Sequence, residues 1–383
     1  MQALTYRGPG WVRIEEHPDP RVEHPNDAIV RVTRATICGS DLHLYHGLIA
    51  DTRVGTIFGH EFTGVVEEIG PSVQNLKRGD RVVVPFNIAC GTCFFCQRER
   101  TSLCESTNPL AHLSGGIFGY SHTTGGYQGG QAELVRVPFA DIGPMKIPDD
   151  LSDEDVLFLS DILPTAYQGA EMGDIGPEDT VAVFGSGPVG LLTQRCAWIL
   201  GARRVIAIDH VDYRLEYSRT YASAETVNFT QVPDIVAHLR KMTDGRGPDV
   251  CIDAVGLEAK GSLFHDVLGR GLLVEAGSPV ALNWCIQSVR RGGRISIVGV
   301  YGPPWNLVDL GTAMNKGLTL KTGQTDVKRY LPRVLEHIRK GRIDPGALIT
   351  HRVPLDQAPE MYRLFAARKD GILKTALVPK GAQ

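Results

Sequence analysis

The sequence predicts an α/β protein of two domains, one built on a doubly wound parallel sheet and the other rich in β-strands. The chain has 383 residues, which is too long for one ordinary core and suits two domains. Between residues 180 and 299, short apolar runs alternate with helical stretches, a pattern typical of a parallel sheet covered on both faces. The first 150 residues instead hold short alternating runs separated by Gly and Pro, which favours a barrel-like β domain.

Each expected strand rests on its own run of Val, Ile and Ala. In the β-rich domain, the runs that alternate with polar residues lie at 28–32, 64–69 and 81–84. In the parallel sheet, the more continuous apolar runs lie at 180–184, 204–209, 250–254 and 294–299. A helix that extends to Leu200 is expected to follow the first of these buried strands.

The C-terminal segment is expected to rejoin the first domain. From Gln324 the chain becomes charged and helical, and it ends in a strand-like run at 375–378. The expected domains are therefore residues 1–162 with 324–383, and residues 163–323.

Composition and charge argue against several partners. The net charge is −3 and 22% of residues are charged, so no basic field favours nucleic acid or an anionic membrane surface. No apolar run approaches the roughly 20 residues that a membrane span needs, and the N-terminal segment lacks the apolar stretch of an export signal. We therefore expect a cytoplasmic protein without a membrane or nucleic-acid partner.

A glycine-rich turn follows the first buried strand of the second domain. Gly185-Ser186-Gly187-Pro188-Val189-Gly190 matches G-x-G-x-x-G, and a helical stretch comes after it. In a Rossmann fold such glycines let the backbone approach a pyrophosphate, and the helix N-terminus supplies amide donors. Asp209 ends the next strand at the expected offset, where a carboxylate accepts ribose hydroxyls and repels a 2′-phosphate. The pattern predicts NAD, although Arg214 is close enough in sequence to partner a phosphate and leave NADP open.

Four cysteines lie within fifteen residues, at positions 90, 93, 96 and 104. Cys90, Cys93, Cys96 and Cys104 supply a complete tetrahedral shell, so the spacing predicts a structural zinc site. An iron–sulfur cluster uses similar C-x-x-C spacing and is the chemical alternative.

A second group of metal-ligating side chains is spread further along the chain. Cys38 and His60 lie in Gly-flanked segments and provide two of the three protein ligands that a catalytic zinc needs. Asp161 is a carboxylate inside an apolar run, where it is costly unless paired or bound to a cation. Glu61 is the alternative third ligand, and Asp41 is a candidate to orient the ring of His60.

These segments together resemble the zinc-containing medium-chain alcohol dehydrogenases over nearly the whole chain, with a GroES-like catalytic domain. Gly59-His60-Glu61-Phe62-Thr63-Gly64, followed by Gly70 and Val73, is similar to the zinc signature of that family. The resemblance is closest to the formaldehyde-dehydrogenase-like branch, and the segments that carry it are 84–91, 159–165 and 322–325. In that branch the third zinc ligand is an Asp in the Ser-Asp-Ile-Leu-Pro-Thr segment, which favours Asp161 over Glu61.

The resemblance also implies roles for residues around the metal. Ser40 and His43 match a proton relay, and Phe86 falls where an aromatic residue lines the substrate pocket. Independently of the resemblance, Glu61 adjoins His60 in the sequence and is a third candidate catalytic residue beside Ser40 and His43. Thr165 and the Val298-Gly299-Val300 loop match contacts to the nicotinamide, so Thr165, Val298 and Val300 are candidate cofactor-binding residues.

The expected activity is zinc-dependent hydride transfer between NAD and a primary alcohol or aldehyde. Formaldehyde-type compounds are among the candidate substrates. One alternative is an aldehyde dismutase that retains NAD(H), and another is a nucleotide-binding relative without catalysis. Relatives of the dismutase kind shield the cofactor with an insertion near residues 258–283, where this chain has a different sequence. The resemblance further implies a homodimer or homotetramer.

Overall fold

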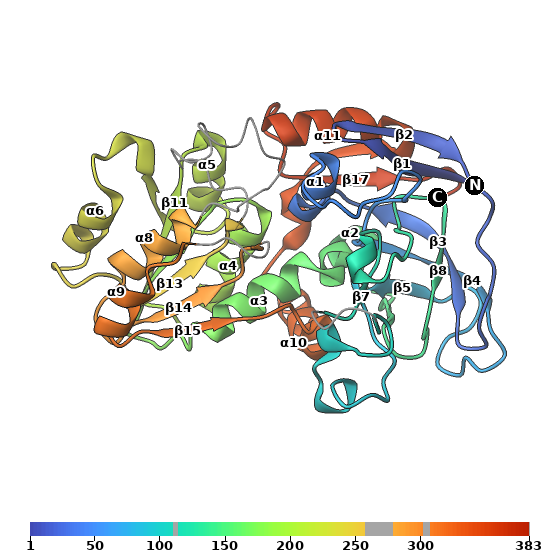
Figure 1. Ribbon diagram of the computed structural model, residues 1–383, viewed down its shortest axis with the longest axis horizontal. Coiled ribbons are helices and arrows are strands. Elements are labelled where there is room, and N and C mark those ends of the chain that lie inside the picture. Colours follow the sequence, from blue (N-terminus) through green and yellow to red (C-terminus); the bar gives the residue numbers. More distant parts are fainter. Residues whose placement is uncertain (110–113, 257–278, 302–306, 383) are drawn as a thin grey trace. The chain divides into compact units, whose positions relative to one another are not determined.

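Two units make up the part of the chain that the computed structural model describes, which is residues 1–109, 114–256, 279–301 and 307–382. The first unit contains Met1–Pro164 and Gln324–Gln383, and the second contains Thr165–Gly323. The two units are seen in Figure 1.

The second unit is built on a six-stranded sheet with the strand order β12-β11-β10-β13-β14-β15, in which every neighbouring pair is parallel. The strands are β10 (Thr180–Phe184), β11 (Arg204–Asp209), β12 (Glu225–Asn228), β13 (Val250–Asp253), β14 (Arg294–Ile297) and β15 (Thr319–Thr322). The helices are α3 (Ile162–Met172, which begins in the first unit), α4 (Pro188–Ile199), α5 (Asp212–Thr220), α6 (Ile235–Met242), α8 (Val280–Ser288) and α9 (Leu310–Asn315).

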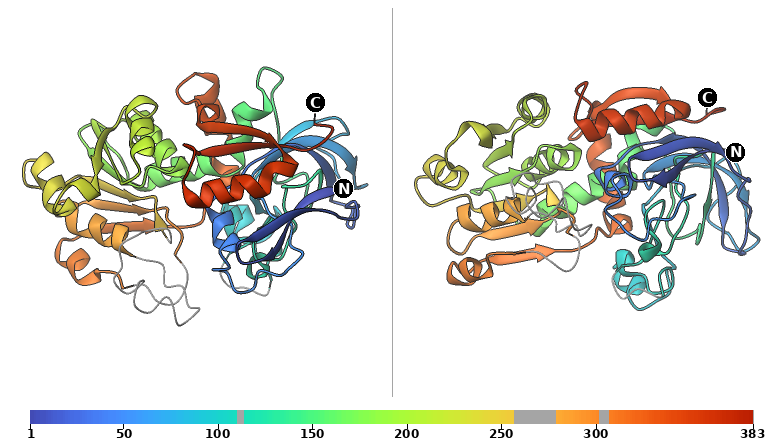
Figure 2. Two further views of the ribbon diagram at one scale, coloured as in Figure 1. Left: turned by 90° about the horizontal axis from the view of Figure 1, so that it is seen from above. Right: turned by 45° about the horizontal axis from the view of Figure 1, so that its top comes forward.

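Both faces of this sheet are buried. Successive side chains of a strand point to opposite faces, so alternate residues of one strand enter two different cores. On β10, Val181 and Val183 pack into a core that includes Ala197 of α4. Ala182 and Phe184 pack into a second core with residues of α6, α8 and α9. The helices flank the sheet in Figures 1 and 2, and this doubly wound, Rossmann-like arrangement confirms the predicted fold class.

The first unit is built mainly from antiparallel strands. A seven-stranded sheet has the order β16-β17-β3-β4-β5-β9, with β8 paired to β3. Its strands are β3 (Ala28–Ala35), β4 (Phe62–Ile69), β5 (Arg81–Val84), β8 (Leu134–Val137), β9 (Met145–Lys146), β16 (Ile349–Pro354) and β17 (Lys374–Val378). Two smaller sheets pair β1 (Gln2–Gly8) with β2 (Trp11–Glu16), and β6 (Asn87–Ile88) with β7 (Gly116–Ile117).

Helices complete the first unit. They are α1 (Gly39–Tyr45), α2 (Asp153–Val156), α10 (Val327–Arg339) and α11 (Ala358–Ala367). Short 3-10 turns join them, among them η1 (Cys96–Arg98), η2 (Thr101–Leu103), η3 (His122–Thr124), η4 (Leu157–Ser160), η7 (Pro345–Leu348) and η8 (Leu355–Gln357), while η5 (Phe229–Gln231) belongs to the second unit. Helix α11 packs beside β2 (Figure 2), and β17 pairs with β3, so the C-terminal strand lies in the same sheet as the early strands.

The strands expected from apolar runs correspond to β3, β4, β5, β10, β11, β13, β14 and β17. The hairpin of β1 and β2 and the edge strands β12 and β15 were not expected, because their sequences mix polar and apolar residues. Most of the stretch 258–283 lies outside the described residues. No helix of the described ranges is both long and apolar enough to cross a membrane.

Candidate active site and metal centres

Helix α1 places the first candidate zinc ligand. Cys38 is its N-cap residue, and the carboxylate of Asp41 accepts a hydrogen bond of 2.8 Å from the backbone N–H of Cys38. This reciprocal cap fixes the start of the helix. Ser40 and His43 are three residues apart on the same helix and therefore share one side of it; the Ser40 hydroxyl lies 3.7 Å from the Cys38 thiol.

The second ligand and the two rival third ligands converge on Cys38. One donor atom from each of Cys38, His60, Glu61 and Asp161 lies within 4.8 Å of the others, and all four residues are buried. His60 and Glu61 come just before β4, and Asp161 lies between η4 and α3. The structure thus brings together residues that are up to 123 positions apart in the chain.

Asp161 and Glu61 differ in what surrounds them. Asp161 Oδ2 lies 3.3 Å from His60 Nε2 and 3.8 Å from Cys38 Sγ. Two ligands about 2.05 Å from a tetrahedral zinc are themselves about 3.3 Å apart, so Asp161 and His60 already have the spacing of a ligand pair. Glu61 Oε1 instead accepts a hydrogen bond from Lys374 Nζ.

Lys374 is a site residue that no sequence motif singles out. Its side chain is 1% exposed, and its ammonium also donates to the carbonyl of Ile37 over 3.1 Å. Burial lowers the pKa of Lys374, but the charge and hydrogen bond of Glu61, together with the nearby Cys38 and Asp161, outweigh burial and hold this pKa above its ordinary value. Burial raises the pKa of Glu61, and Lys374 opposes that shift. The two side chains form a buried ion pair beside the candidate ligands.

The donor set fits a divalent cation. Three buried carboxylates, those of Asp41, Glu61 and Asp161, surround one ammonium and one imidazole. Burial lowers the pKa of His60, yet the nearby charge of Asp41 and the hydrogen bond to Asp161 raise it well above its usual value. A metal ion on His60 would replace the proton that these carboxylates attract.

Aromatic rings flank His60. Its imidazole meets Phe86 edge-on at a centroid distance of 6.1 Å and Tyr120 at 6.5 Å. Phe86, expected near the substrate, is therefore beside the candidate metal ligands, and Tyr120 is a second aromatic neighbour that the sequence did not indicate. Burial raises the pKa of the Tyr120 hydroxyl, which keeps it protonated.

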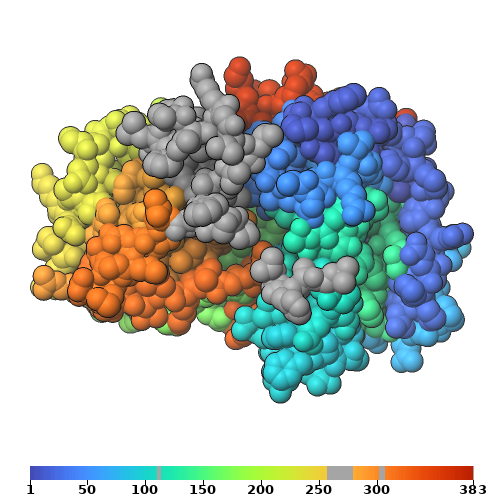
Figure 3. Space-filling model, in the orientation of Figure 1, coloured from blue at the N-terminus to red at the C-terminus, as the bar shows by residue number. Residues whose placement is uncertain are grey.

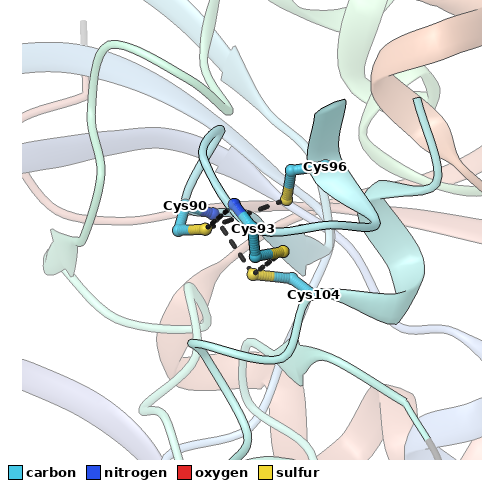
Figure 4. Close-up of side chains that lie close together, drawn as sticks. All are labelled: Cys90, Cys93, Cys96 and Cys104. Atoms are coloured by element: carbon cyan, nitrogen blue, oxygen red, sulfur yellow. Dashed lines mark hydrogen bonds between the residues drawn. The ribbon is translucent and has the colours of Figure 1, made fainter. Parts of the chain in front are cut away.

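The four cysteines form a separate cluster in a lobe of the first unit, drawn in cyan in Figures 1 and 3. Their thiols lie within 4.8 Å of one another and face a common centre in Figure 4. The Cys90–Cys96 and Cys93–Cys104 sulfur pairs are 4.0 and 3.9 Å apart. The sulfurs of one tetrahedral zinc are about 3.8 Å apart, so the spacing fits a single ion better than a cluster of several irons.

Hydrogen bonds favour the thiolate form of one member of this cluster, Cys90. The backbone N–H groups of Thr92 and Cys93 donate to Cys90 Sγ over 3.4 and 3.3 Å. Burial raises the pKa of Cys90, but hydrogen bonds from Ser106 and Thr92 overcome this and lower it to about 6. A thiol with this pKa is a thiolate at neutral pH, which is the form that binds zinc.

A buried carboxylate joins the cysteine lobe to the start of α10. Asp326 accepts hydrogen bonds from the backbone N–H and the hydroxyl of Ser102 at 3.0 and 2.7 Å, and from Arg100 at 2.9 Å. Asp326 is 226 residues from Arg100, and it directly follows the segment 322–325 that contributed to the family resemblance. The lobe is therefore fixed to the C-terminal part of its own unit.

The glycine-rich turn in the second unit has the geometry of a dinucleotide-binding loop. Gly185 has a φ of 98°, which favours glycine. A Cβ on Gly190 would lie 2.0 Å from the carbonyl oxygen of Gly185, so the turn and helix α4 approach too closely for any side chain. Gly187 caps α4, Pro188 and Val189 begin it, and its N-terminal amides are available to a phosphate.

Asp209 holds this turn as well as ending β11. Its Oδ2 accepts a 2.7 Å hydrogen bond from Ser186 N, and its Oδ1 accepts from His210 N and Val211 N at 2.6 and 3.0 Å. A carboxylate has about four acceptor positions, so these bonds leave room for a ribose hydroxyl. Arg214 is also near, because its guanidinium lies 3.7 Å from where a Cβ on Gly187 would be.

The residues expected near the nicotinamide lie in the same unit. Thr165 is on α3, and Val298 and Val300 follow β14. Val298 N and Gly299 N both donate to the carbonyl of Asp253 over 2.9 Å, which fixes this loop to the end of β13. Val300 is 39% exposed.

A β domain with two metal-type clusters and a Rossmann-like sheet with a dinucleotide loop together define a zinc-type oxidoreductase. The family descriptions "Alcohol dehydrogenase GroES-like domain" and "Zinc-binding dehydrogenase" match residues 24–149 and 188–268. An uncharacterized zinc-type alcohol dehydrogenase-like protein of Bacillus subtilis is 42% identical, over 99% of this chain and 100% of its own. The chain therefore belongs to the zinc-type medium-chain alcohol dehydrogenase family.

Two further relatives bear on the branch and the fold. A glutathione-independent formaldehyde dehydrogenase of Pseudomonas aeruginosa is 34% identical, over 96% of this chain and 95% of its own. The structure of the alcohol dehydrogenase TADH from Thermus sp. ATN1 superposes with a TM-score of 0.86 at 39% identity, over 99% of this chain and 100% of that one. The expected resemblance to the zinc alcohol dehydrogenases and their formaldehyde-dehydrogenase-like members is thus confirmed.

Replacing Cys104 with Ser is expected to lower the zinc content by about one ion per chain and to lower the melting temperature. The reason is that the lobe loses one of four sulfur ligands, and structural zinc contributes directly to folding. Activity per folded molecule should change less than stability. Elemental analysis and thermal unfolding measure both, with Cys196→Ser as the control, because Cys196 is equally buried and lies outside both clusters. A Cys104→Ser protein with the wild-type zinc content and stability would rule out the lobe as a zinc site.

Proposed function

We propose that the protein is a zinc-dependent, NAD-linked dehydrogenase that interconverts primary alcohols and aldehydes, formaldehyde-type substrates among the candidates. The observation that carries this proposal is that the ligand atoms of Cys38, His60 and Asp161 lie close together and buried. Of these, His60 and Asp161 have the spacing of a zinc-ligand pair. Catalytic zinc sites have three protein ligands and one open position. Glu61, held by Lys374, is assigned beside the metal and not on it.

The residues around the proposed metal have separate tasks. When bound there, zinc supplies a Lewis acid that polarises the substrate oxygen. Ser40 takes the proton of the substrate alcohol and passes it toward His43 on the same side of α1. Phe86 packs against His60 and borders the substrate. Bound NAD would supply the hydride acceptor, and the protein's own part would be to position the substrate carbon and to exclude water.

The second unit, Thr165–Gly323, would bind NAD through its glycine turn. Gly185, Gly187 and Gly190 admit the pyrophosphate, and Asp209 accepts from the ribose. Thr165, Val298 and Val300 would contact the nicotinamide end. The β-rich first unit, Met1–Pro164 with Gln324–Gln383, would be the catalytic domain. We further propose a cytoplasmic homodimer or homotetramer.

Asp209→Gly is expected to weaken NAD and to improve NADP relative to it. The substitution removes one charged hydrogen bond to the ribose, about 1.5–3 kcal/mol, which corresponds to a roughly tenfold to hundredfold loss in kcat/KM for NAD. It also removes a negative charge that would repel a 2′-phosphate. Comparing kcat/KM for both cofactors tests this. Because Asp209 also holds Ser186 N, melting temperature must be measured alongside. Equal use of the two cofactors by the wild-type protein would contradict the assignment of Asp209.

A panel of primary alcohols and aldehydes with NAD, followed through NADH absorbance, tests the proposed function. Alcohol-dependent NADH formation is the expected result. Conversion of an aldehyde to equal amounts of acid and alcohol without net NADH would identify the dismutase alternative. Absence of turnover with every substrate by a zinc-replete, NAD-binding protein would favour a non-catalytic relative.

A further inference from the structure

The carboxylate of Asp41 faces the candidate ligand His60, and other side chains hold it there. Asp41 is fully buried, and its Oδ1 lies 3.3 Å from His60 Nδ1, although the two groups are not aligned as a hydrogen bond in this structure. Asp41 Oδ2 accepts from the backbone N–H of Cys38 at 2.8 Å and from Gln131 Nε2 at 3.3 Å. Among the described residues, Gln131, which lies 90 positions further along the chain, is thus the side chain that donates a hydrogen bond to this carboxylate.

Both polar atoms of the Gln131 side-chain amide form hydrogen bonds. Its Nε2 donates to the carbonyl of Thr36 over 2.9 Å as well as to Asp41, and its Oε1 accepts a 2.9 Å hydrogen bond from the Tyr362 hydroxyl. Turning the amide over would place its oxygen against two acceptors, the Thr36 carbonyl and the Asp41 carboxylate. The orientation of Gln131 is thus fixed by chemistry, and Tyr362 must be the donor.

The backbone also holds Gln131 against the segment that carries His60. Gln131 N donates to the carbonyl of Phe58 over 3.0 Å, and Leu4 N donates to the carbonyl of Gln131 over 2.8 Å. Gly59 has a φ of 96°, and a Cβ there would lie 2.4 Å from Gln131 Cγ. The glutamine stem therefore packs directly on the residue before His60, and both Gln131 and Tyr362 are fully buried.

We infer that Gln131, oriented by Tyr362 of α11, is a positioning residue for the catalytic metal ligand His60. It holds Asp41 so that the carboxylate faces Nδ1 of the imidazole and Nε2 faces the metal. Gln131 touches neither the candidate ligand atoms nor the substrate, and it acts only through Asp41. This inference rests on the proposed function, because it assumes that Cys38, His60 and Asp161 bind zinc.

Two variants remove different parts of the arrangement. Gln131→Met keeps the length of the side chain and removes all three of its hydrogen bonds. Tyr362→Phe removes only the hydroxyl and leaves Gln131 in place. Tyr127→Phe is the matched control, because it loses a tyrosine hydrogen bond of similar length, 3.0 Å to the carbonyl of Thr107, in the same unit.

The readouts are zinc retention against a chelator and the visible spectrum after catalytic zinc is exchanged for Co²⁺. The d–d bands of Co²⁺ report the geometry of its ligands, so they respond to a turned imidazole and not to a general loss of stability. Partners that orient a metal-bound His typically affect metal affinity 10–100-fold. We expect roughly tenfold weaker retention at the catalytic site of Gln131→Met, with shifted bands and a lower kcat. Tyr362→Phe should change in the same direction by less, and Tyr127→Phe should match the wild type.

A folded Gln131→Met protein with wild-type metal retention and an unchanged Co²⁺ spectrum would overturn the inference. If Gln131→Met does not fold, Tyr362→Phe decides: shifted bands support the inference, and wild-type bands overturn it. Failure of the wild-type protein to take up Co²⁺ at this site would instead reject the proposed zinc site on which the inference rests.

Discussion

Asp161→Ala is expected to lose the catalytic zinc and to lower turnover about a thousandfold or more, because Lewis-acid stabilisation is worth several kcal/mol at the transition state. The side chain lies 3.3 Å from His60 and 3.8 Å from Cys38, so its removal takes away one of three proposed ligands. The four-cysteine lobe should keep its ion. Elemental analysis should therefore fall from about two zinc ions per chain to about one, while the melting temperature changes less than in Cys104→Ser.

Asp161→Cys is the matched variant, because a thiolate also binds zinc. It should recover the second ion and part of the activity. If Asp161→Ala kept two zinc ions and wild-type turnover, Asp161 would not be a ligand and Glu61 would take its place as the candidate.

Lys374→Met is expected to destabilise the protein by about 3–5 kcal/mol, because it leaves the buried carboxylate of Glu61 without its partner. The ammonium is the charge that Glu61 contacts, and its hydrogen bond to the Ile37 carbonyl is lost as well. Denaturant unfolding measures the change. By the same reasoning Glu61→Ala should also destabilise the protein, since it leaves the buried ammonium of Lys374 without its partner.

The double variant Glu61→Gln/Lys374→Met separates pairing from other effects. Replacing both charges should recover most of the stability that Lys374→Met loses, since neither charge is then left buried alone. A double variant no more stable than Lys374→Met would show that the lysine stabilises the fold by some route other than this ion pair.

The parts of the site that the sequence predicted are those with short, chemically specific spacing. Cys90, Cys93, Cys96 and Cys104 lie in one loop, so spacing alone brings their thiols together. The turn from Gly185 to Gly190 is equally local, because the positive φ of Gly185 and the close approach of the chain at Gly190 restrict these two positions to glycine. Strands with continuous apolar runs were predictable for the same reason, since burial on both faces leaves a strong pattern.

The remaining parts depend on tertiary contacts that a sequence does not display. Lys374 meets Glu61 across 313 residues, and Tyr362 meets Gln131 across 231. A lysine in a C-terminal strand and a glutamine in a glycine-rich loop look like ordinary polar residues until the fold buries them. Asp209 is an intermediate case: its position at a strand end was predicted, but its bonds to Ser186, His210 and Val211 emerge only in the folded turn.

The most direct test of the proposed zinc dehydrogenase is to restore activity to protein from which the catalytic zinc has been removed. A chelator would remove that ion while the four-cysteine site keeps its own, and alcohol-dependent NADH formation would then be followed as Zn²⁺ is added back. We predict little activity in the depleted protein and full recovery after about one equivalent per chain. NADH formation that is undiminished by the loss of this zinc, or that does not return when it is restored, would contradict a catalytic role for the metal at Cys38, His60 and Asp161.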